Sequence, residues 1–448
     1  MSRLIKILKP APPIPEIKGH AKVAKEYRYW RWRIFYSMYF GYIFYYFTRK
    51  SFTFAMPALM VDLGLNEADL GMLGTLWALA YGISKFTSGI LADRSNPRYF
   101  LSIGLILTGI LNIFFGLSSS IVFFSLFWGL NGWFQGWGWP GCARLLTHWY
   151  SQKERGRWWG VWNTSHNVGG AIIPLIAAYC AMRWGWRSAM YVPGVACIGL
   201  GFILMNRLRD TPQSLGLPSI EKFKNDYPTK DHNDTEKELS VKQILVGYIL
   251  KNKYIWLLAA AYFFVYIVRQ AINDWSVLFL MRQKGYEALM ASTCVSLFEV
   301  GGFFGSLAAG WGSDSIFKGK RGPVNALFMV GVFGSVVAFY FAPGQYVVLN
   351  HALVFLIGFF VFGPQMLIGV AAAELSHKKA AATATGFTGC FAYLGAAVAG
   401  FPLGWVINKF GWYQYFVIIA ACSIVATLIL LPLWPVNTNP SRMAKAAK

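Results

Sequence analysis

Residues 98–118 read RYFLSIGLILTGILNIFFGLS, and stretches of this kind decide the fold. After Arg98 this run holds no charged residue, and it is long enough to cross a hydrocarbon core about 30 Å thick. Similar runs recur along the chain. Over the whole chain, 56% of the residues are hydrophobic and only 13% are charged, whereas a soluble domain carries about 25% charged residues. The sequence therefore predicts a polytopic, all-α membrane protein.

We predict twelve transmembrane helices in two sets of six. Their approximate bounds are 34–58, 66–91, 98–118, 121–149, 156–182, 187–207, 254–281, 288–313, 323–342, 346–374, 380–408 and 412–435. A polar stretch separates the two sets. The predicted organisation is a basic tail (1–33), a six-helix bundle (34–207), a linker (208–253), a second six-helix bundle (254–435) and a short tail (436–448).

The distribution of positive charge predicts the orientation. Lys and Arg gather in the tail and in the linker, and such clusters mark cytoplasmic loops. The predicted outer loop 59–70 contains Asp62, Glu67 and Asp69 but no Lys or Arg. Because the number of spans is even, we expect both termini on the cytoplasmic side of the cell inner membrane. Five basic residues are exceptions on the outer side: Arg183, Arg187, Arg282, Lys284 and Lys409.

The net charge of +22 does not indicate a nucleic-acid partner, since such a partner would need a basic face on a folded domain. The six cysteines lie within apolar runs, without the spacing of metal ligands, and are expected to be small packing residues in lipid or in helix interfaces. The sequence also offers no nucleophile–base pair and no carboxylate dyad. We therefore expect no enzyme activity, no cofactor and no metal. The expected surroundings of the protein are a lipid bilayer.

The two sets of helices repeat each other. A G-x-x-x-D segment at 89–93 returns at 310–314, an offset of 221, and Arg49 and Arg269 are 220 residues apart. A nearly constant offset indicates a parallel duplication of six helices. In transporters built this way, the substrate site lies near mid-membrane, where the two halves meet.

Few ionisable residues lie well within the predicted spans. Each charge at the centre of a bilayer costs roughly 2.5–3.5 kcal/mol, so these groups should line a polar cavity or pair with one another. Four of them are positive and two are negative, which indicates an anionic substrate. The residues are Arg49, Lys50, Lys85, His166, Arg269, Asp274 and Glu299.

Polar side chains also follow one face of four predicted helices, at spacings of three and four residues. This pattern is typical of the lining of a cavity. The faces consist of Tyr42, Tyr45, Tyr46 and Arg49; of Tyr81 and Lys85; of Asn163, His166, Asn167, Gly170 and Pro174; and of Tyr262, Tyr266, Arg269 and Asn273.

The candidate ligand of these faces is a phosphate. The planar fork of arginine matches phosphate oxygens in a bidentate manner. Because Arg49 and Arg269 hold equivalent positions in the two halves, we expect one phosphate to bind both. Asn163 and the tyrosines can then hydrogen-bond an attached polyol. His166 shares the face of Asn163, which favours substrate contact or a proton role over packing.

Structural roles remain open for several of these residues. Arg269 and Asp274 are five positions apart on one helix and can neutralise each other, or Glu299 can bridge them. Lys50 can satisfy neighbouring carbonyl groups, and Lys85 can extend toward the cytoplasmic surface. The tyrosines can simply pack between helices.

The two G-x-x-x-D segments sit at tight cytoplasmic loops beside basic residues. Asp93 is followed by Arg94, and Asp314 lies close to Arg321. We interpret these groups as state-dependent latches between helices and not as substrate ligands.

Together these segments resemble the organophosphate:phosphate antiporters of the major facilitator superfamily, over residues 1–440. The segments that carry the resemblance are Tyr45–Pro57 (YYFTRKSFTFAMP), Tyr81–Phe86 (YGISKF), Phe134–Pro140 (FQGWGWP), Ser151–Gly156 (SQKERG), Trp162–Gly170 (WNTSHNVGG), Asp210–Pro218 (DTPQSLGLP) and Gly363–Gly369 (GPQMLIG). The resemblance implies exchange of inorganic phosphate for an organic phosphate, by a protein that commonly acts as a monomer. It also implies a phosphate-binding pair with neighbouring cavity residues, namely Arg49 and Arg269 with Lys85, His166, Gln135, Trp139, Tyr266 and Tyr393.

Within this family the chain is most similar to the hexose-phosphate branch, which implies glucose 6-phosphate as the substrate. One departure is the uncharged segment 391–400 (FAYLGAAVAG), where the dedicated hexose-phosphate transporter carries an Asp and a Lys. Phe362 stands where the glycerol-phosphate branch has Tyr. Two alternatives stay open: a membrane receptor of external glucose 6-phosphate acting on a histidine kinase, and a glycerol-3-phosphate:phosphate antiporter.

Overall fold

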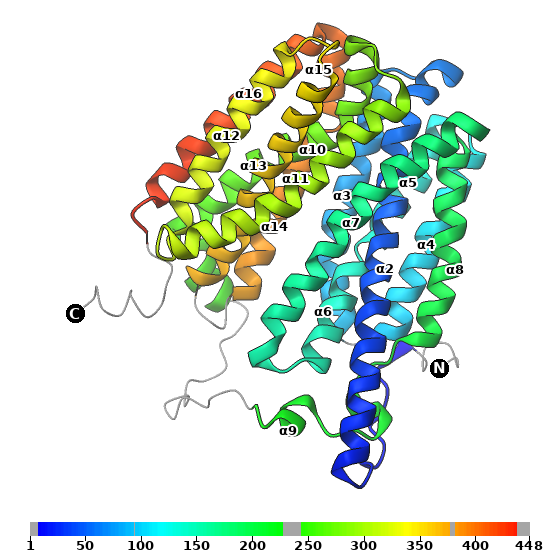
Figure 1. Cartoon of the computed structure of the whole chain (residues 1–448), viewed down its shortest axis with the longest axis vertical. Coiled ribbons are helices and arrows are strands. Elements are labelled where there is room, and N and C mark those ends of the chain that lie inside the picture. Colours follow the sequence, from blue (N-terminus) through cyan, green and yellow to red (C-terminus); the bar gives the residue numbers. More distant parts are fainter. Residues whose placement is uncertain (1–7, 94, 227–242, 377–380, 437–448) are drawn as a thin grey trace. The chain divides into compact units, whose positions relative to one another are not determined.

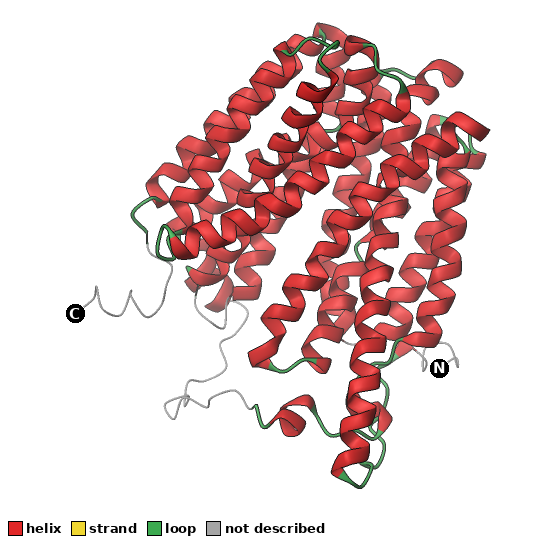
Figure 2. Cartoon of the chain, viewed as in Figure 1, coloured by secondary structure: helices red, strands yellow, loops and turns green. Residues whose placement is uncertain are grey.

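The computed structural model describes residues 8–93, 95–226, 243–376 and 381–436. In this part of the chain the regular elements are all helices, as Figure 2 shows, so the predicted fold class is confirmed. The first half contains α2 (His20–Leu63), α3 (Glu67–Asp93), α4 (Pro97–Leu117), α5 (Ile121–Gln135), α6 (Gly138–Trp149), α7 (Gln152–Trp184) and α8 (Ser188–Arg207). The second half contains α10 (Lys253–Lys284), α11 (Ala288–Ser315), α12 (Arg321–Phe341), α13 (Val347–Glu374), α14 (Ala381–Val398), α15 (Phe401–Phe410) and α16 (Trp412–Leu430).

The helices overlap the twelve predicted spans, but the count of twelve is not exact because two of those spans are interrupted. The predicted span 121–149 divides into α5 and α6, and the span 380–408 divides into α14 and α15. Nine helices of the described chain are long and apolar enough to cross a membrane. The long helix α2 is not among them.

Short elements occupy the predicted linker. They are η1 (Pro212–Leu215), α9 (Ile220–Lys224) and the π-helical η2 (Gln243–Leu250), while η4 (Leu431–Leu433) follows α16. The remainder of the linker, residues 227–242, and the predicted tails at 1–7 and 437–448 lie outside the described residues.

The chain forms two compact units. Unit 1 comprises residues 1–52, 83–173 and 187–236, and unit 2 comprises residues 53–82, 174–186 and 237–448. Unit 2 therefore includes segments of the first half, namely the end of α2, the start of α3 and the end of α7.

In unit 1, α4 packs along α8 and against α5 and α6 (Figure 1). Several buried amide and hydroxyl groups in this interior are paired, which offsets the cost of burying them in a low-dielectric core. Asn112 on α4 donates to the Ser51 hydroxyl at 3.0 Å, and Asn131 on α5 donates to the carbonyl of Thr108 at 3.2 Å. These bonds join α2, α4 and α5 where apolar packing alone would not fix their register.

In unit 2, α11 and α13 pack side by side at very short range. Gly301 and Gly305 form a G-x-x-x-G pattern on α11, a spacing that lets two membrane helices approach closely. A Cβ atom at Gly305 would lie 1.8 Å from the carbonyl oxygen of Phe359 on α13. The two glycines therefore set the distance between these helices.

The helix α2 begins well before the predicted span, at His20 rather than at residue 34. Its added turns bury Val23, Tyr27 and Ile34, which are spaced to share one helical face. Part of the predicted basic tail is therefore a helical extension of the first span.

The Asp210–Pro218 motif anchors the segment that precedes α2. The Asp210 carboxylate is buried and accepts a hydrogen bond from the backbone N–H of Ala11 at 2.8 Å. It also pairs with Arg144 on α6 at 3.1 Å. The motif thus joins the start of the chain, the linker and α6 within unit 1.

Candidate functional site

The α5–α6 interruption falls on the motif FQGWGWP, residues 134–140. Pro140 lacks the N–H that would bond the carbonyl of Gly136 in a continuous helix. That carbonyl accepts a hydrogen bond from the Ser88 hydroxyl on α3 at 2.7 Å instead. The helix α5 therefore ends at Gln135, and the turn that follows it is hydrogen-bonded to α3.

Gln135 is an almost fully buried amide that is held at both ends. Its Nε2 donates to the carbonyl of Tyr45 at 3.0 Å and to the Thr48 hydroxyl at 2.9 Å. Its Oε1 accepts from Nε of Arg49 at 3.4 Å. Since both amide hydrogens are engaged, the carbonyl oxygen is oriented toward the guanidinium group and helps to position it.

The ring of Tyr46 lies against the same guanidinium group. Its Cζ lies 4.5 Å from the ring centre of Tyr46, within the range of a cation–π contact. The Tyr46 ring in turn lies 5.7 Å from the ring of His166 and 5.8 Å from that of Tyr42. Tyr42 also contacts Trp162 at 4.9 Å. Unit 1 thus brings Arg49, Tyr42 and Tyr46 of α2 together with His166 of α7.

The other predicted residues of unit 1 lie on neighbouring helices. The Nζ atom of Lys85 on α3 lies 5.4 Å from the ring centre of Trp139 on α6. Lys50 is buried, and Asn163 is half-buried on α7.

Unit 2 holds the second predicted arginine among aromatic rings. Arg269 on α10 is buried, and its Cζ lies 4.9 Å from the ring centre of Phe362 and 5.6 Å from that of Tyr266. The ring of Tyr393 on α14 lies 5.6 Å from Tyr266 and 4.7 Å from Tyr81. The predicted residues Arg269, Tyr266, Tyr393 and Tyr81 therefore form one contiguous group.

The two predicted acidic residues are both placed in unit 2. Asp274 accepts hydrogen bonds from the side-chain amides of Gln270 at 2.8 Å and Asn273 at 2.7 Å. Glu299 on α11 is fully buried. Because Arg49 belongs to unit 1 and Arg269 to unit 2, their joint contact with one phosphate remains a prediction.

The family model of the Major Facilitator Superfamily matches residues 38–400. The chain belongs to the Major Facilitator Superfamily. It is 57% identical to a probable hexose phosphate transport protein of Chlamydia pneumoniae, with 98% of each chain covered. It is 49% identical to the membrane sensor protein UhpC of Escherichia coli (strain K12), covering 96% of this chain and 98% of that protein. These relatives confirm the predicted resemblance to the organophosphate:phosphate antiporter branch.

A solved structure agrees with this assignment at the level of the fold. It is the inward-facing, occupied form of a bacterial homologue of the human lysosomal transporter Spinster. Its TM-score to this chain is 0.70 at 17% sequence identity, with 90% of this chain and 95% of that chain covered. At this identity the comparison shows a shared Major Facilitator Superfamily fold alone.

One of the two predicted latches, that of Asp314, lies within the described residues. Arg321 at the start of α12 forms ion pairs with Asp314 at the end of α11 and with Glu374 at the end of α13, the latter at 2.9 Å. Asp314 is thus part of a three-helix cluster. Glu374 was not predicted. The other latch, formed by the side chain of Asp93 and by Arg94, lies outside the described residues.

Phe362 was not predicted to be a neighbour of Arg269. A phenylalanine within an apolar span gives no signal that its ring faces a cation. Gly302 on α11 supplies the space for it, because a Cβ atom there would lie 2.5 Å from the Phe362 ring.

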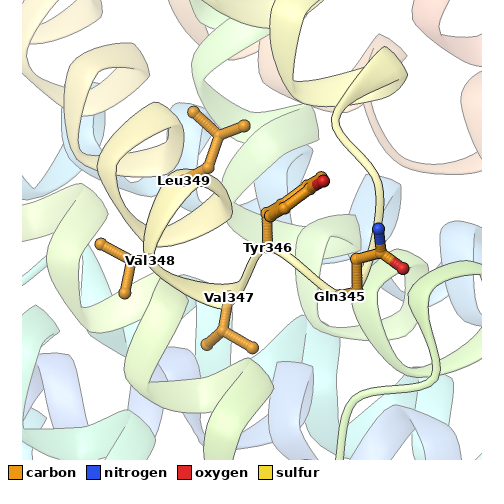
Figure 3. Close-up of a pocket in the computed structure, with 5 residues that line it drawn as sticks. All are labelled: Gln345, Tyr346, Val347, Val348 and Leu349. Atoms are coloured by element: carbon orange, nitrogen blue, oxygen red, sulfur yellow. The ribbon is translucent and has the colours of Figure 1, made fainter.

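A further hollow of about 580 Å³ lies at the start of α13 and is lined by residues 345–349. Figure 3 shows these five side chains, which point in different directions and include one amide and one phenol. None of the five carries a positive charge, so this hollow does not suit a phosphate. Among the described residues, no cluster of His, Cys, Asp and Glu could hold a metal ion.

Proposed function

We propose that this chain is a secondary antiporter that exchanges glucose 6-phosphate for inorganic phosphate across the cell inner membrane. The observation that carries the proposal is the pair of arginines at equivalent positions of the repeat, each set against aromatic side chains. Gln135 and Tyr46 position Arg49, and Tyr266 and Phe362 flank Arg269. The relative named as a probable hexose phosphate transport protein, at 57% identity, supports the hexose phosphate as cargo.

The arginines account for obligatory exchange. A bound phosphate dianion would neutralise Arg49 and Arg269 and allow the two halves to close around it. Without an anion, closure would bring two like charges together in a low-dielectric site, where their repulsion is strong. The empty protein would therefore reorient slowly, and a second anion would be needed for the return step.

The sugar would be recognised by the polar side chains next to the arginines. Hydroxyl groups of the hexose can bond Asn163, His166 and the tyrosines of unit 1. Tyr266 and Tyr393 offer an amphipathic surface in unit 2, suited to the faces of a sugar ring. Both termini would lie in the cytoplasm, and the protein would act as a monomer.

The test is uptake of labelled glucose 6-phosphate into proteoliposomes that contain only this purified chain. We expect uptake when inorganic phosphate is present inside and little uptake when it is absent. Unlabelled glycerol 3-phosphate serves as a competitor outside. If glycerol 3-phosphate inhibited uptake as strongly as unlabelled glucose 6-phosphate, the hexose assignment would be wrong. Uptake at the same rate with and without internal phosphate would exclude exchange.

A second candidate function is that of a membrane receptor for external glucose 6-phosphate. The 49% identity to the membrane sensor protein UhpC favours it, as does the uncharged segment 391–400. A receptor would bind the sugar phosphate and signal through a partner such as a histidine kinase. Saturable binding of glucose 6-phosphate, without uptake that depends on internal phosphate, would favour this function over transport.

A further inference from the structure

A cavity of about 240 Å³ lies in unit 1, outside the group of residues around Arg49. Its walls come from the helical extension of α2, from the α6–α7 junction and from α9, which Figure 1 shows beside the first turns of α2. The lining combines aromatic and basic side chains. It consists of Ala24, Tyr27, Arg28, Arg31, Trp32, Tyr150, Trp158, Phe223 and Lys224.

The aromatic walls are preformed. The ring of Phe223 on α9 stacks on Tyr27 at 4.2 Å, and Trp32 and Tyr150 contact Trp158 at 5.3 and 4.8 Å. The hydroxyl groups of Tyr27 and Tyr150 donate to the carbonyl oxygens of Pro218 and Arg31, so both are already used. Burial raises the pKa of both hydroxyls, which keeps them neutral. Any charged ligand must therefore bind the cations of the lining.

Three cations line the cavity, and three acids lie close to its walls, namely Glu154, Glu221 and Glu16. Arg31 pairs with Glu154 at 2.6 Å and lies over the Tyr150 ring. The Nε atom of Arg31 is nevertheless buried and has no hydrogen-bond partner within the described part of the chain. Arg28 and Lys224 are exposed at the rim. Glu154 pairs with Arg31 and Glu16 pairs with Lys222, so Arg28 and Lys224 are opposed by Glu221 and one positive charge remains in excess. Together with the Nε donor of Arg31, this excess suits an anion such as a phosphate group.

An exposed apolar stripe leads away from the cavity along α2. Trp32, Tyr36 and Phe40 follow at intervals of four residues and are 57%, 39% and 50% exposed. The stripe enters the predicted span that begins at residue 34, and tryptophan and tyrosine are typical of the membrane–water boundary. A free phosphate compound would not use such a stripe, whereas an acyl chain would lie along it.

We propose that this cavity binds the phosphate headgroup of an anionic phospholipid, whose acyl chains lie along Trp32, Tyr36 and Phe40. Basic residues on the cytoplasmic side of a membrane attract anionic lipids in general. Here the cavity adds a defined place for one headgroup at the junction of α2, the α6–α7 turn and α9. The site is separate from the transport residues, so it offers a means by which the lipid composition can stabilise unit 1.

The test is native mass spectrometry of the full chain, released from nanodiscs of phosphatidylcholine and phosphatidylglycerol. We expect one phosphatidylglycerol to stay bound, and to bind at least tenfold more weakly to the R28Q/K224Q double variant. The matched control is K22Q/K25Q, which removes the same charge from exposed positions of α2 that do not line the cavity. A W32A variant tests the stripe and should also weaken retention.

Several results would overturn the proposal. Equal loss of phosphatidylglycerol in the two double variants would show diffuse attraction to a basic surface and no defined site. Displacement of the lipid by inorganic phosphate or by glucose 6-phosphate would assign the cavity to a free phosphate compound. Equal retention of phosphatidylcholine would exclude selection of an anionic headgroup. Circular dichroism of each variant should match that of the parent chain, so that a loss of binding is not a loss of fold.

Discussion

Glu67 and Arg282 form an ion pair at 2.6 Å, although 215 residues separate them in the sequence. Glu67 is the first residue of α3, in the first half of the chain, and Arg282 lies in the last turn of α10, in the second half. Asn408 on α15 donates to the other carboxylate oxygen of Glu67 at 3.2 Å. One carboxylate in unit 2 therefore joins helices from both halves of the repeat.

We expect the E67Q variant to loosen this contact. The Glu67 side chain is 11% exposed but that of Arg282 is 42% exposed, so the loss of stability should lie near the upper end of the range for exposed pairs, at about 1 kcal/mol. If the pair holds this end of the protein closed, a cysteine placed at Thr75 should react faster with an impermeant thiol reagent in E67Q. The charge-exchanged variant E67R/R282E should return the reaction rate toward that of the parent. An unchanged rate in E67Q would show that the pair does not control access.

Close packing of α3 on α15 gives a second prediction. A Cβ atom at Gly71 would lie 2.6 Å from the carbonyl oxygen of Gly400, whereas one at Gly74 would lie 3.7 Å from its nearest neighbour, Gly400 Cα. We therefore expect G71A to lower the thermal transition of the purified protein and its exchange rate, since backbone atoms must move. The matched variant G74A should leave both close to the parent values. Similar behaviour of the two variants would contradict the tight contact.

The helices and their polar faces could be predicted because both depend on local patterns. A run of about 20 apolar residues indicates a membrane span, and spacings of three and four residues place Tyr42, Tyr46 and Arg49 on one face. The structure brings these residues together. The early start of α2 was missed, because a basic segment gives no hydropathy signal even where its buried face continues.

Long-range partners could not be predicted in the same way. Arg187 and Lys284 were exceptions to the rule that positive residues gather in the cytoplasmic loops. The structure gives both a structural role, because Arg187 donates to the carbonyl of Gly116 at the end of α4 and Lys284 to that of Ala342 at the end of α12. Cations at helix C-termini are favourable. Such roles depend on which helix ends meet, and the sequence of one segment does not specify that.

The phosphate-binding role of Arg49 predicts a severe effect of the R49K variant. Lysine keeps the charge but cannot form the planar fork, and it loses the directed contact to Gln135. A hydrogen bond to a charged group contributes about 1.5–3 kcal/mol, so exchange should fall at least tenfold. The measurement is phosphate exchange in proteoliposomes at equal protein insertion. Near-normal exchange by inserted R49K protein would contradict the two-arginine site.

Gln135 gives the sharpest test of positioning, because Asn131 on the same helix offers a matched control. Both are buried amides of α5. Gln135 accepts a hydrogen bond from Arg49, whereas Asn131 donates to the carbonyl of Thr108. We expect Q135A to raise the apparent KM for phosphate about five- to tenfold, as the loss of roughly 1 kcal/mol of positioning would require. N131A should lower the thermal transition with little change in KM. A rise in KM of the same size in both variants would show that general loosening of unit 1, and not the orientation of Arg49, weakens phosphate binding.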